Sequence, residues 1–329
     1  MAFALPLGLT LLRTCARQAT DRNLKGVNSL ALPQSRTIHV ALTFTDNYWA
    51  LAYAVMRSIC LTTVRRREVV FHLIHTEMQP DHLAILDRIP EEFSASLVHY
   101  DPEANAAFRG LVADLPATDR FPWIVYARLV LDKFLPPGTE RVIYLDCDTM
   151  VVQPIEELYE LDMGGHPIAA AFDPFHLGIK KGRDIKRKQT PFDTGDRYFN
   201  SGVLLFDLAR YAEVDVPGRV KDMAASGALK NLFFDQDLLN LIFLHNWQPL
   251  HWRFNVLNPK PAHESLHVVI LHYTAGQHPW HVYANVAFRR LYRHVMSNDV
   301  YYRFLAERWP RWLGPIIDRA RLYNMNRSD

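Results

Sequence analysis

Two aspartates separated by one residue, Asp146-Cys147-Asp148, follow the apolar run Val142 to Leu145. Because side chains alternate along a strand, we expect both carboxylates to point the same way while Cys147 turns inward. His272 ends a second apolar run, Val268 to Leu271. Two carboxylates suit Mg²⁺ or Mn²⁺, and an imidazole nitrogen favours Mn²⁺. Alone, such a pair of aspartates is more often a solvated strand end, and such a histidine is more often a core residue. Together they predict a diphosphate-binding metal site with Asp146, Asp148 and His272 as ligands.

Two more polar segments could serve the same site. Asp235 and Gln236 stand at the amino end of a predicted helix, where an aspartate can also act simply as an N-cap. Asn200-Ser201-Gly202 leads into an apolar strand. Its glycine either lets the backbone approach a ligand closely or marks a bulge.

Composition narrows the class of protein. The 329 residues are 49% hydrophobic, which is enough for a large core, and the net charge of +2 gives no case for nucleic acid as a partner. The three cysteines, Cys15, Cys60 and Cys147, lack metal-type spacing, which argues against a disulfide framework or zinc site and favours a reducing compartment. The longest apolar stretch near the start, Phe3 to Leu12, is too short to span a membrane.

Strand-like and helix-like segments alternate along the first half of the chain. Such alternation predicts an α/β fold, a mainly parallel Rossmann-like sheet flanked by helices. We expect strands at 37–43, 69–75, 95–100, 141–145, 168–172, 198–206 and 266–271, and helices at 49–60, 81–89, 123–134 and 238–244. Ligands of such sheets collect beyond the carboxyl ends of the strands, where Asp46 and Asp146 both fall.

Taken in order, these segments resemble glycosyltransferase family 8, the retaining GT-A enzymes that include bacterial lipo-oligosaccharide galactosyltransferases and glycogenin. The resemblance spans about Ile38 to His281 and rests on seven motifs in the family's order. They are Asp46-Asn47-Tyr48, Tyr126-Ala127-Arg128-Leu129, Tyr144-Leu145-Asp146-Cys147-Asp148, Tyr198-Phe199-Asn200-Ser201-Gly202-Val203-Leu204, Asp235-Gln236-Asp237, Trp252-Arg253-Phe254-Asn255 and His272-Tyr273, followed by Pro279-Trp280-His281.

The resemblance implies a GT-A nucleotide-diphospho-sugar transferase and a role for each matching residue. Asp146, Asp148 and His272 would bind Mn²⁺, or Mg²⁺, and through it the UDP diphosphate. Asn47 and Tyr48 would meet the ribose and uracil, with Thr43, Thr45, Asp46 and Cys147 beside the nucleotide. Arg128, Asn200, Asp235 and Gln236 would hold the transferred sugar, with Gln236 nearest the anomeric carbon, and Asp173 would face the acceptor.

Two departures from the family pattern concern the nucleotide. Thr45 stands where the family often has an acidic residue, which weakens the expected contact with the base. His278 stands where a lysine would contact the diphosphate, so we expect that a histidine replaces it or that the basic loop Lys180 to Lys188 serves instead.

Three segments are expected: a poorly ordered basic leader (1–36), with a signal or targeting peptide as the alternative, a GT-A catalytic domain (37–288) and a basic aromatic tail (289–329). Arginines and aromatics in the tail could cover the domain's own core, but they favour contact with an anionic membrane surface. This predicts a cytoplasmic enzyme, peripheral at the inner face of a membrane.

The predicted function is metal-dependent, retaining transfer of galactose or glucose from a UDP-hexose donor to a hydroxyl of a glycan or glycolipid acceptor. The alternatives are a sugar nucleotidyltransferase, which also places carboxylates and a metal on an α/β sheet, and a catalytically silent carbohydrate-binding protein of the same fold.

Overall fold

A computed structural model describes residues 37–113, 115, 122–173, 192, 196–231, 234–274, 276–281 and 284–308. The chain divides into two units, residues 1–36 and residues 37–329. The predicted leader and the basic loop Lys180 to Lys188 lie outside the described residues. Across its described ranges, no helix is both long and apolar enough to cross a membrane.

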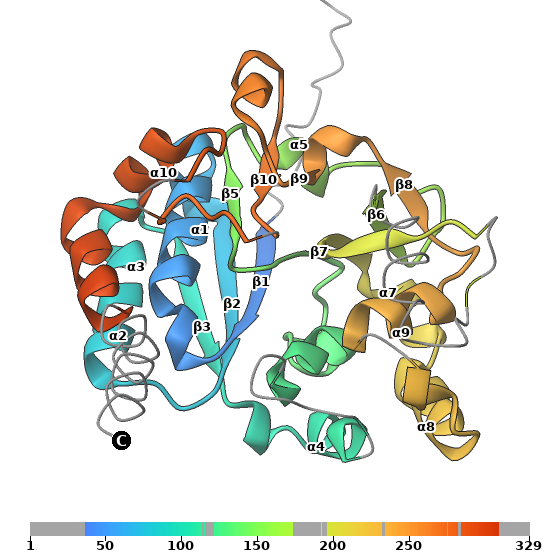
Figure 1. Ribbon diagram of the computed structural model, residues 1–329. Coiled ribbons are helices and arrows are strands. Elements are labelled where there is room, and N and C mark those ends of the chain that lie inside the picture. Colours follow the sequence, from blue (N-terminus) through green and yellow to red (C-terminus); the bar gives the residue numbers. More distant parts are fainter. Residues whose placement is uncertain are drawn as a thin grey trace, which may run out of the picture. The chain divides into compact units, whose positions relative to one another are not determined.

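The described residues form a seven-stranded central sheet (Figure 1). Its order is β3 (Ser96–Tyr100), β2 (Val69–His75), β1 (Ile38–Phe44), β4 (Arg141–Leu145), β7 (Phe199–Asp207), β6 (Ile168–Phe172) and β8 (Gln248–Leu250). Neighbouring strands are parallel except at β7, which is antiparallel to both β4 and β6. The predicted α/β fold with a mainly parallel sheet is confirmed.

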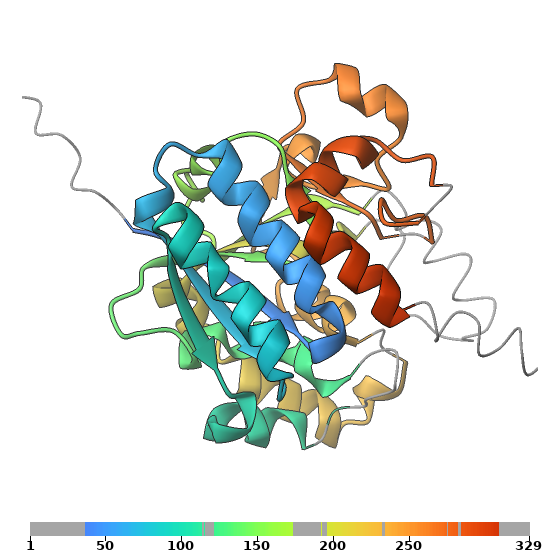
Figure 2. The same cartoon turned by 90° about the vertical axis from the view of Figure 1, so that its left-hand side faces the viewer.

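Helices cover both faces of this sheet (Figures 1 and 2). One face carries α1 (Trp49–Thr62), α2 (Pro80–Leu86), α3 (Arg88–Phe93) and α10 (Arg289–Met296), and the other carries α4 (Ala106–Val112), η4 (Trp123–Lys133), α7 (Leu208–Glu213), α8 (Val216–Ala225) and α9 (Phe234–Ile242). Alternation along the strands creates two cores: Val40 and Leu42 pack with α1, whereas Ala41 packs with η4.

Short elements complete the described unit. A second sheet has the order β5 (Thr149–Val151), β10 (Ile270–His272) and β9 (Val256–Leu257). The remaining helices are α5 (Glu156–Tyr159), η1 (Asp46–Tyr48), η2 (Arg66–Glu68), η3 (Pro102–Ala104), η6 (Ala228–Asn231), η7 (Trp252–Phe254) and η8 (Pro261–Ser265), with one more over 298–308.

The strand geometry predicted for Asp146 and Asp148 was wrong, whereas His272 ends a strand as predicted. The Asp146-Cys147-Asp148 segment is a turn between β4 and β5, closed by Thr149, whose backbone N–H and hydroxyl both donate to the carbonyl of Asp146. Strand alternation therefore does not orient the carboxylates, although Cys147 is buried as expected. His272 ends β10, which belongs to the small sheet and is shorter than the predicted strand 266–271.

Two predicted helices also differ from the structure. The segment 81–89 falls into α2 and α3, because Pro90 has no N–H with which to continue a single helix. The segment 123–134 is a 3₁₀ run with non-helical backbone at Val130. Its carbonyls serve other donors: Arg128 donates to Val125 O and Tyr211 donates to Leu129 O.

The described part of the predicted tail packs on the helix layer that contains α1. Tyr292 and Val295 of α10 belong to the same core as α1, as do Tyr301 and Phe304 of the following helix, whereas Tyr302 is exposed. Residues 309–329 lie outside the described ranges. Contact of the tail with a membrane stays a prediction.

Asn240 ties α9 to β7 and thereby fixes the helix that carries Asp235 and Gln236. Its side chain is fully buried, accepts from Phe199 N at 2.8 Å and donates to Phe199 O at 2.9 Å. We expect Asn240→Leu to lower the free energy of unfolding by about 3 kcal/mol, because two buried backbone groups lose their partners. Urea denaturation measures this, with the exposed Asn246→Ala as control, and equal stability of both variants would contradict it.

Candidate active site

Asp146, Asp148 and His272 meet beyond the carboxyl end of β4. One ligand atom from each lies within 4.8 Å of the others. His272 Nε2 is 3.1 Å from Asp148 Oδ1 and 3.7 Å from Asp146 Oδ2. The imidazole is buried while both carboxylates are partly exposed, so the cluster is open on its oxygen side. Two oxygen ligands and one nitrogen ligand form a donor set that suits Mn²⁺.

The backbone at Gly202 makes room for this cluster. A Cβ atom added there would lie 2.1 Å from His272 Cε1 and 2.6 Å from Asp146 Oδ2. The register between β6 and β7 also shifts between Ala170 and Phe172, where β7 carries Asn200 to Val203. The glycine therefore lies at an irregularity of the sheet, as one of its two readings predicted, and it lets the side chains of His272 and Asp146 approach the backbone closely. Close approach of a ligand at Gly202 stays a prediction.

Arg128 pairs with the carboxylates of Asp146 and Asp235. Its guanidinium donates to Asp146 Oδ1 at 2.8 Å, to Ser201 O at 3.0 Å, and contacts Asp235 Oδ2 at 3.2 Å. It lies over the ring of Tyr144, whose hydroxyl also donates to Asp146 Oδ1. Asp146 Oδ1 is thus occupied, and Oδ2 is the oxygen that faces His272.

Gln236 is held at both ends of its amide. Its Oε1 accepts from Asn200 Nδ2 and from Ser201 N, both at 3.2 Å. Its Nε2 donates to Asp173 Oδ2 at 3.3 Å and to Tyr198 OH at 3.1 Å. The structure therefore brings together the residues predicted to hold the sugar and the residue predicted to face the acceptor.

The residues predicted to lie beside the nucleotide have different surroundings. Tyr48 is 42% exposed, and its pKa is raised by burial of the hydroxyl and, after that, by the negative charge of Asp148. Thr43 hydrogen-bonds the hydroxyl of Tyr144, and the carbonyl of Thr45 accepts from Tyr48 N. Burial raises the pKa of the Cys147 thiol, whose side chain belongs to the core.

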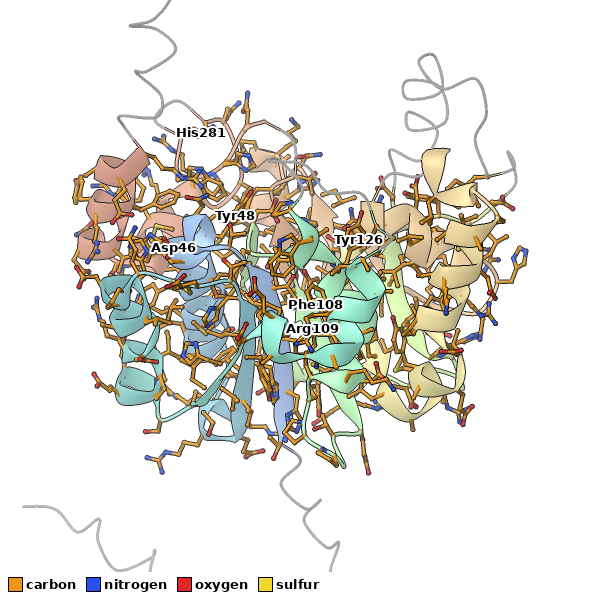
Figure 3. The ribbon with its side chains drawn as sticks, turned by 90° about the horizontal axis from the view of Figure 1, so that it is seen from below. Asp46, Tyr48, Phe108, Arg109, Tyr126 and His281 are labelled. Carbon is orange, nitrogen blue, oxygen red and sulfur yellow. The ribbon has the colours of Figure 1, made fainter. Side chains whose placement is uncertain are left out.

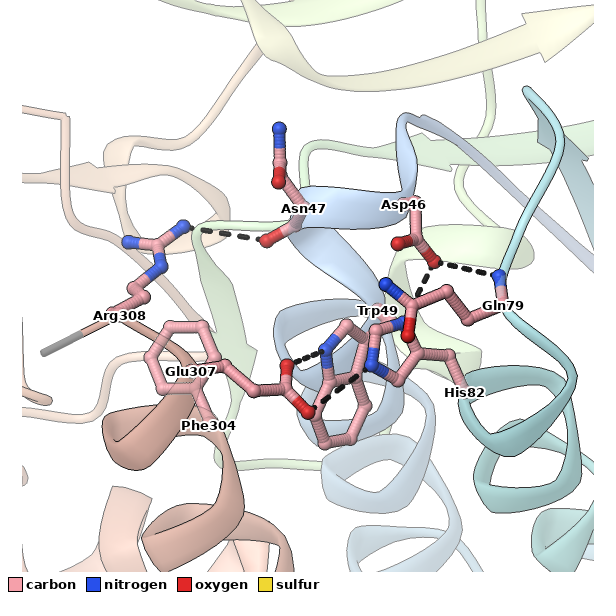
Figure 4. Close-up of a pocket in the computed structure, with 8 residues that line it drawn as sticks. All are labelled: Asp46, Asn47, Trp49, Gln79, His82, Phe304, Glu307 and Arg308. Carbon is pink, nitrogen blue, oxygen red and sulfur yellow. Dashed lines mark hydrogen bonds and ion pairs between the residues drawn. The ribbon is translucent and has the colours of Figure 1, made fainter. Parts of the chain in front are cut away.

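Asp46 instead lines a pocket of about 240 Å³ on the α2 side (Figure 4). Its carboxylate accepts from Gln79 N at 3.2 Å and lies 2.7 Å from His82 Nδ1. The carboxylate of Asp46 therefore anchors η1 to α2. Asp46 and Tyr48 are labelled in Figure 3, as is His281 of the segment after β10.

The C-terminal helix over 298–308 closes the other side of this pocket. Glu307 accepts from Trp49 Nε1 at 3.0 Å and contacts His82 Nε2 at 3.2 Å. Arg308 donates to the carbonyl of Asn47 at 3.3 Å (Figure 4). No site role was predicted for Glu307 or Arg308, because nothing near them in sequence links this helix to η1.

His278, in the segment after β10, is partly buried. Its ring stacks on Trp280 with centroids 4.5 Å apart. Burial lowers its pKa, against an opposing effect of Asp148. Its replacement of a diphosphate lysine stays a prediction.

The charges of the cluster support one another. Burial opposes a charged His272, but Asp148 and then Asp146 outweigh it and raise the imidazole pKa. Burial likewise opposes ionisation of Asp148, and His272 outweighs it and lowers the carboxyl pKa. Burial raises the pKa of Asp235, with Arg128 opposing. A cation bound at Nε2 would take the place of the imidazole proton.

Comparisons with known proteins identify the family. Residues 39–284 match the model of a family described as glycosyl transferase family 8. General stress protein A of Bacillus subtilis is 23% identical over 277 residues, which cover 79% of this chain and 93% of that protein. Lipopolysaccharide 1,2-glucosyltransferase of Escherichia coli is 24% identical over 282 residues, which cover 81% and 80%.

A solved structure of the galactosyltransferase LgtC, in complex with donor and acceptor sugar analogs, superposes with a TM-score of 0.64 and 21% identity. The match covers 79% of this chain and 95% of that chain. It confirms the predicted GT-A type fold.

Gly202→Ala tests whether the cluster needs the space that the glycine leaves. The added methyl would displace His272 or Asp146, so we expect affinity for a divalent cation to fall by about a hundredfold, as loss of well-placed ligands does. Titration with Mn²⁺ followed by electron paramagnetic resonance measures free cation. Gly110→Ala, whose added Cβ meets nothing within 4 Å, is the control. Parent-like affinity of Gly202→Ala would argue against this cation site.

Proposed function

Since the chain belongs to glycosyl transferase family 8, we propose that it transfers a hexose from a UDP-sugar, with retention of anomeric configuration, in a reaction that depends on Mn²⁺. The observation that carries this proposal is the cluster of Asp146, Asp148 and His272 beside Gln236 and Asn200. It combines a cation site with a rigid polar site for a sugar. Galactose and glucose are the sugars we propose.

The cation would be held by Asp146 Oδ2, Asp148 and His272 Nε2, and it would neutralise charge on the leaving diphosphate. Arg128 engages Asp146 Oδ1, which leaves Oδ2 on the side of His272. Tyr48 offers an exposed ring, which suits stacking on a base. These residues orient the donor, while Asp235 and Gln236 lie where positive charge on the sugar ring can be stabilised.

We propose that the acceptor hydroxyl attacks on the face from which UDP leaves, with the leaving phosphate taking the proton. Gln236 is a poor nucleophile, and its amide is held by four hydrogen bonds. Asp235 is the alternative nucleophile. Its Oδ2 is engaged by Arg128 and by the hydroxyl of Ser201, which favours a stabilising role.

We propose a glycan or glycolipid as the acceptor, because the Escherichia coli relative is named for lipopolysaccharide. Asp173 is the residue we place toward it, since it contacts Gln236 from β6. Cytoplasmic location at a membrane face belongs to the same proposal and rests on the arginines of the C-terminal segment.

Family membership weighs against a sugar nucleotidyltransferase. Activity measurements distinguish an enzyme from a catalytically silent carbohydrate-binding protein of the same fold.

Asp148→Asn tests the dependence on metal. We expect it to lower UDP release from UDP-galactose or UDP-glucose with Mn²⁺ by about a hundredfold or more, because neutralising the leaving group is worth several kcal/mol. Asp222→Asn, on the exposed face of α8, should retain full activity. Turnover of the parent enzyme that persists in EDTA would reject the metal-dependent mechanism.

Gln236→Ala tests the placement of the sugar. Contacts that strengthen mainly in the transition state affect turnover more than affinity, so we expect kcat to fall while the KM for the donor changes little. A rise in KM alone would show that Gln236 only binds the donor.

Retention is checked independently by NMR of the product. The anomeric configuration of the donor should persist, because the acceptor attacks on the face from which UDP leaves. An inverted product would exclude same-face attack and a double displacement alike.

A further inference from the structure

An unbroken series of side-chain hydrogen bonds joins His272 to Gln236 through two asparagines. His272 Nδ1 lies 3.0 Å from Asn255 Oδ1, Asn255 Nδ2 lies 2.9 Å from Asn200 Oδ1, and Asn200 Nδ2 lies 3.2 Å from Gln236 Oε1. We call Asn255, Asn200 and Gln236 the amide chain. Asn255 is buried between η7 and β9, and neither the sequence nor the proposed mechanism gave it a role.

The backbone of β7 fixes the direction of this chain. Gly202 N donates to Asn200 Oδ1 at 3.0 Å, and Ser201 N donates to Gln236 Oε1 at 3.2 Å. A backbone N–H can only donate, so both side-chain oxygens must face the backbone. The Asn200 amide nitrogen therefore points to Gln236, and the Asn255 amide nitrogen must point to Asn200.

This direction determines which nitrogen of His272 carries a proton. With its amide nitrogen committed to Asn200, Asn255 presents Oδ1 to the imidazole, and a carbonyl oxygen only accepts. Nδ1 must therefore be the donor. In the neutral ring the lone pair then lies on Nε2, the nitrogen that faces Asp148.

We propose that Asn255 is a positioning residue that couples the metal centre to the sugar site. Its Oδ1 holds His272 in the tautomer that can bind a cation, as partners of metal-binding histidines generally do. Its Nδ2 holds Asn200, which in turn holds Gln236. This inference rests on the proposed function, because it assumes that Asp146, Asp148 and His272 bind the cation.

Two substitutions of Asn255 separate the two contacts. Asn255→Leu removes both, so we expect Mn²⁺ affinity to fall by about ten- to a hundredfold and kcat to fall with it. Asn255→Asp can still accept from His272 Nδ1 but cannot donate to Asn200. We expect it to bind Mn²⁺ at least as tightly as the parent, while kcat falls at least about tenfold because Asn200 now meets an acceptor on both sides.

A purely structural role would give a different result. Asn240 is another buried asparagine; it bonds the backbone of β7 and not His272. Asn240→Leu should therefore lower stability and leave Mn²⁺ affinity unchanged. Parent-like Mn²⁺ affinity in Asn255→Leu, or equal loss of affinity in both Asn255 variants, would overturn the proposal.

The tautomer is also measurable in the unsubstituted protein. Long-range ¹H–¹⁵N spectra of histidine-labelled protein with Mg²⁺, assigned by comparison with His272→Gln, should show a proton on Nδ1 of His272 and none on Nε2. The reverse tautomer would overturn the proposal even where no Asn255 variant folds.

Binding of Mn²⁺ by Asp148→Asn separates this inference from the proposed function. If Asp148→Asn binds Mn²⁺ as the parent does, the metal assignment itself fails. If that variant loses binding and Asn255→Leu keeps it, the metal site stands and only the role of Asn255 is rejected.

Discussion

The buried guanidinium of Arg128 is the interaction on which the rest of the site depends. It contacts the end of β4 through Asp146, β7 through Ser201 and α9 through Asp235. A buried charge is tolerated only when it is paired and hydrogen-bonded, so these three elements must converge around it. Removing it would leave two carboxylates facing each other with no compensating cation between them.

The antiparallel strand β7 orients the amide side chains next to this ion pair. Its irregular start brings the backbone of Ser201 and Gly202 against the carboxylates, so that backbone N–H groups orient the amides of Asn200 and Gln236. Backbone groups cannot be exchanged by mutation. The backbone of β7 therefore sets the direction of the hydrogen bonds in the site, and side chains such as Asn255 continue that direction to His272.

Much of the fold and the cation cluster could be predicted from the sequence, because long apolar runs identify buried strands and polar residues at their ends identify a ligand edge. Asp146 and Asp148 were found by an argument that the structure corrects, since a turn rather than a strand aligns them. The amide chain has no local pattern. Asn200 and Asn255 are 55 residues apart, and their contact arises only when the residue that follows η7 meets β7.

The contacts between Trp49 and Glu307 also bear on how the protein is made. These residues are 258 positions apart, and ribosomes add about 5–20 residues per second, so tens of seconds separate their synthesis. Until the helix over 298–308 is synthesised, η1 lacks the residues that close its pocket, and Trp49 Nε1 lacks Glu307 as its acceptor. The loop after β1 is therefore synthesised early in this unit, yet it can make these contacts only after the residues of the helix over 298–308 have been added.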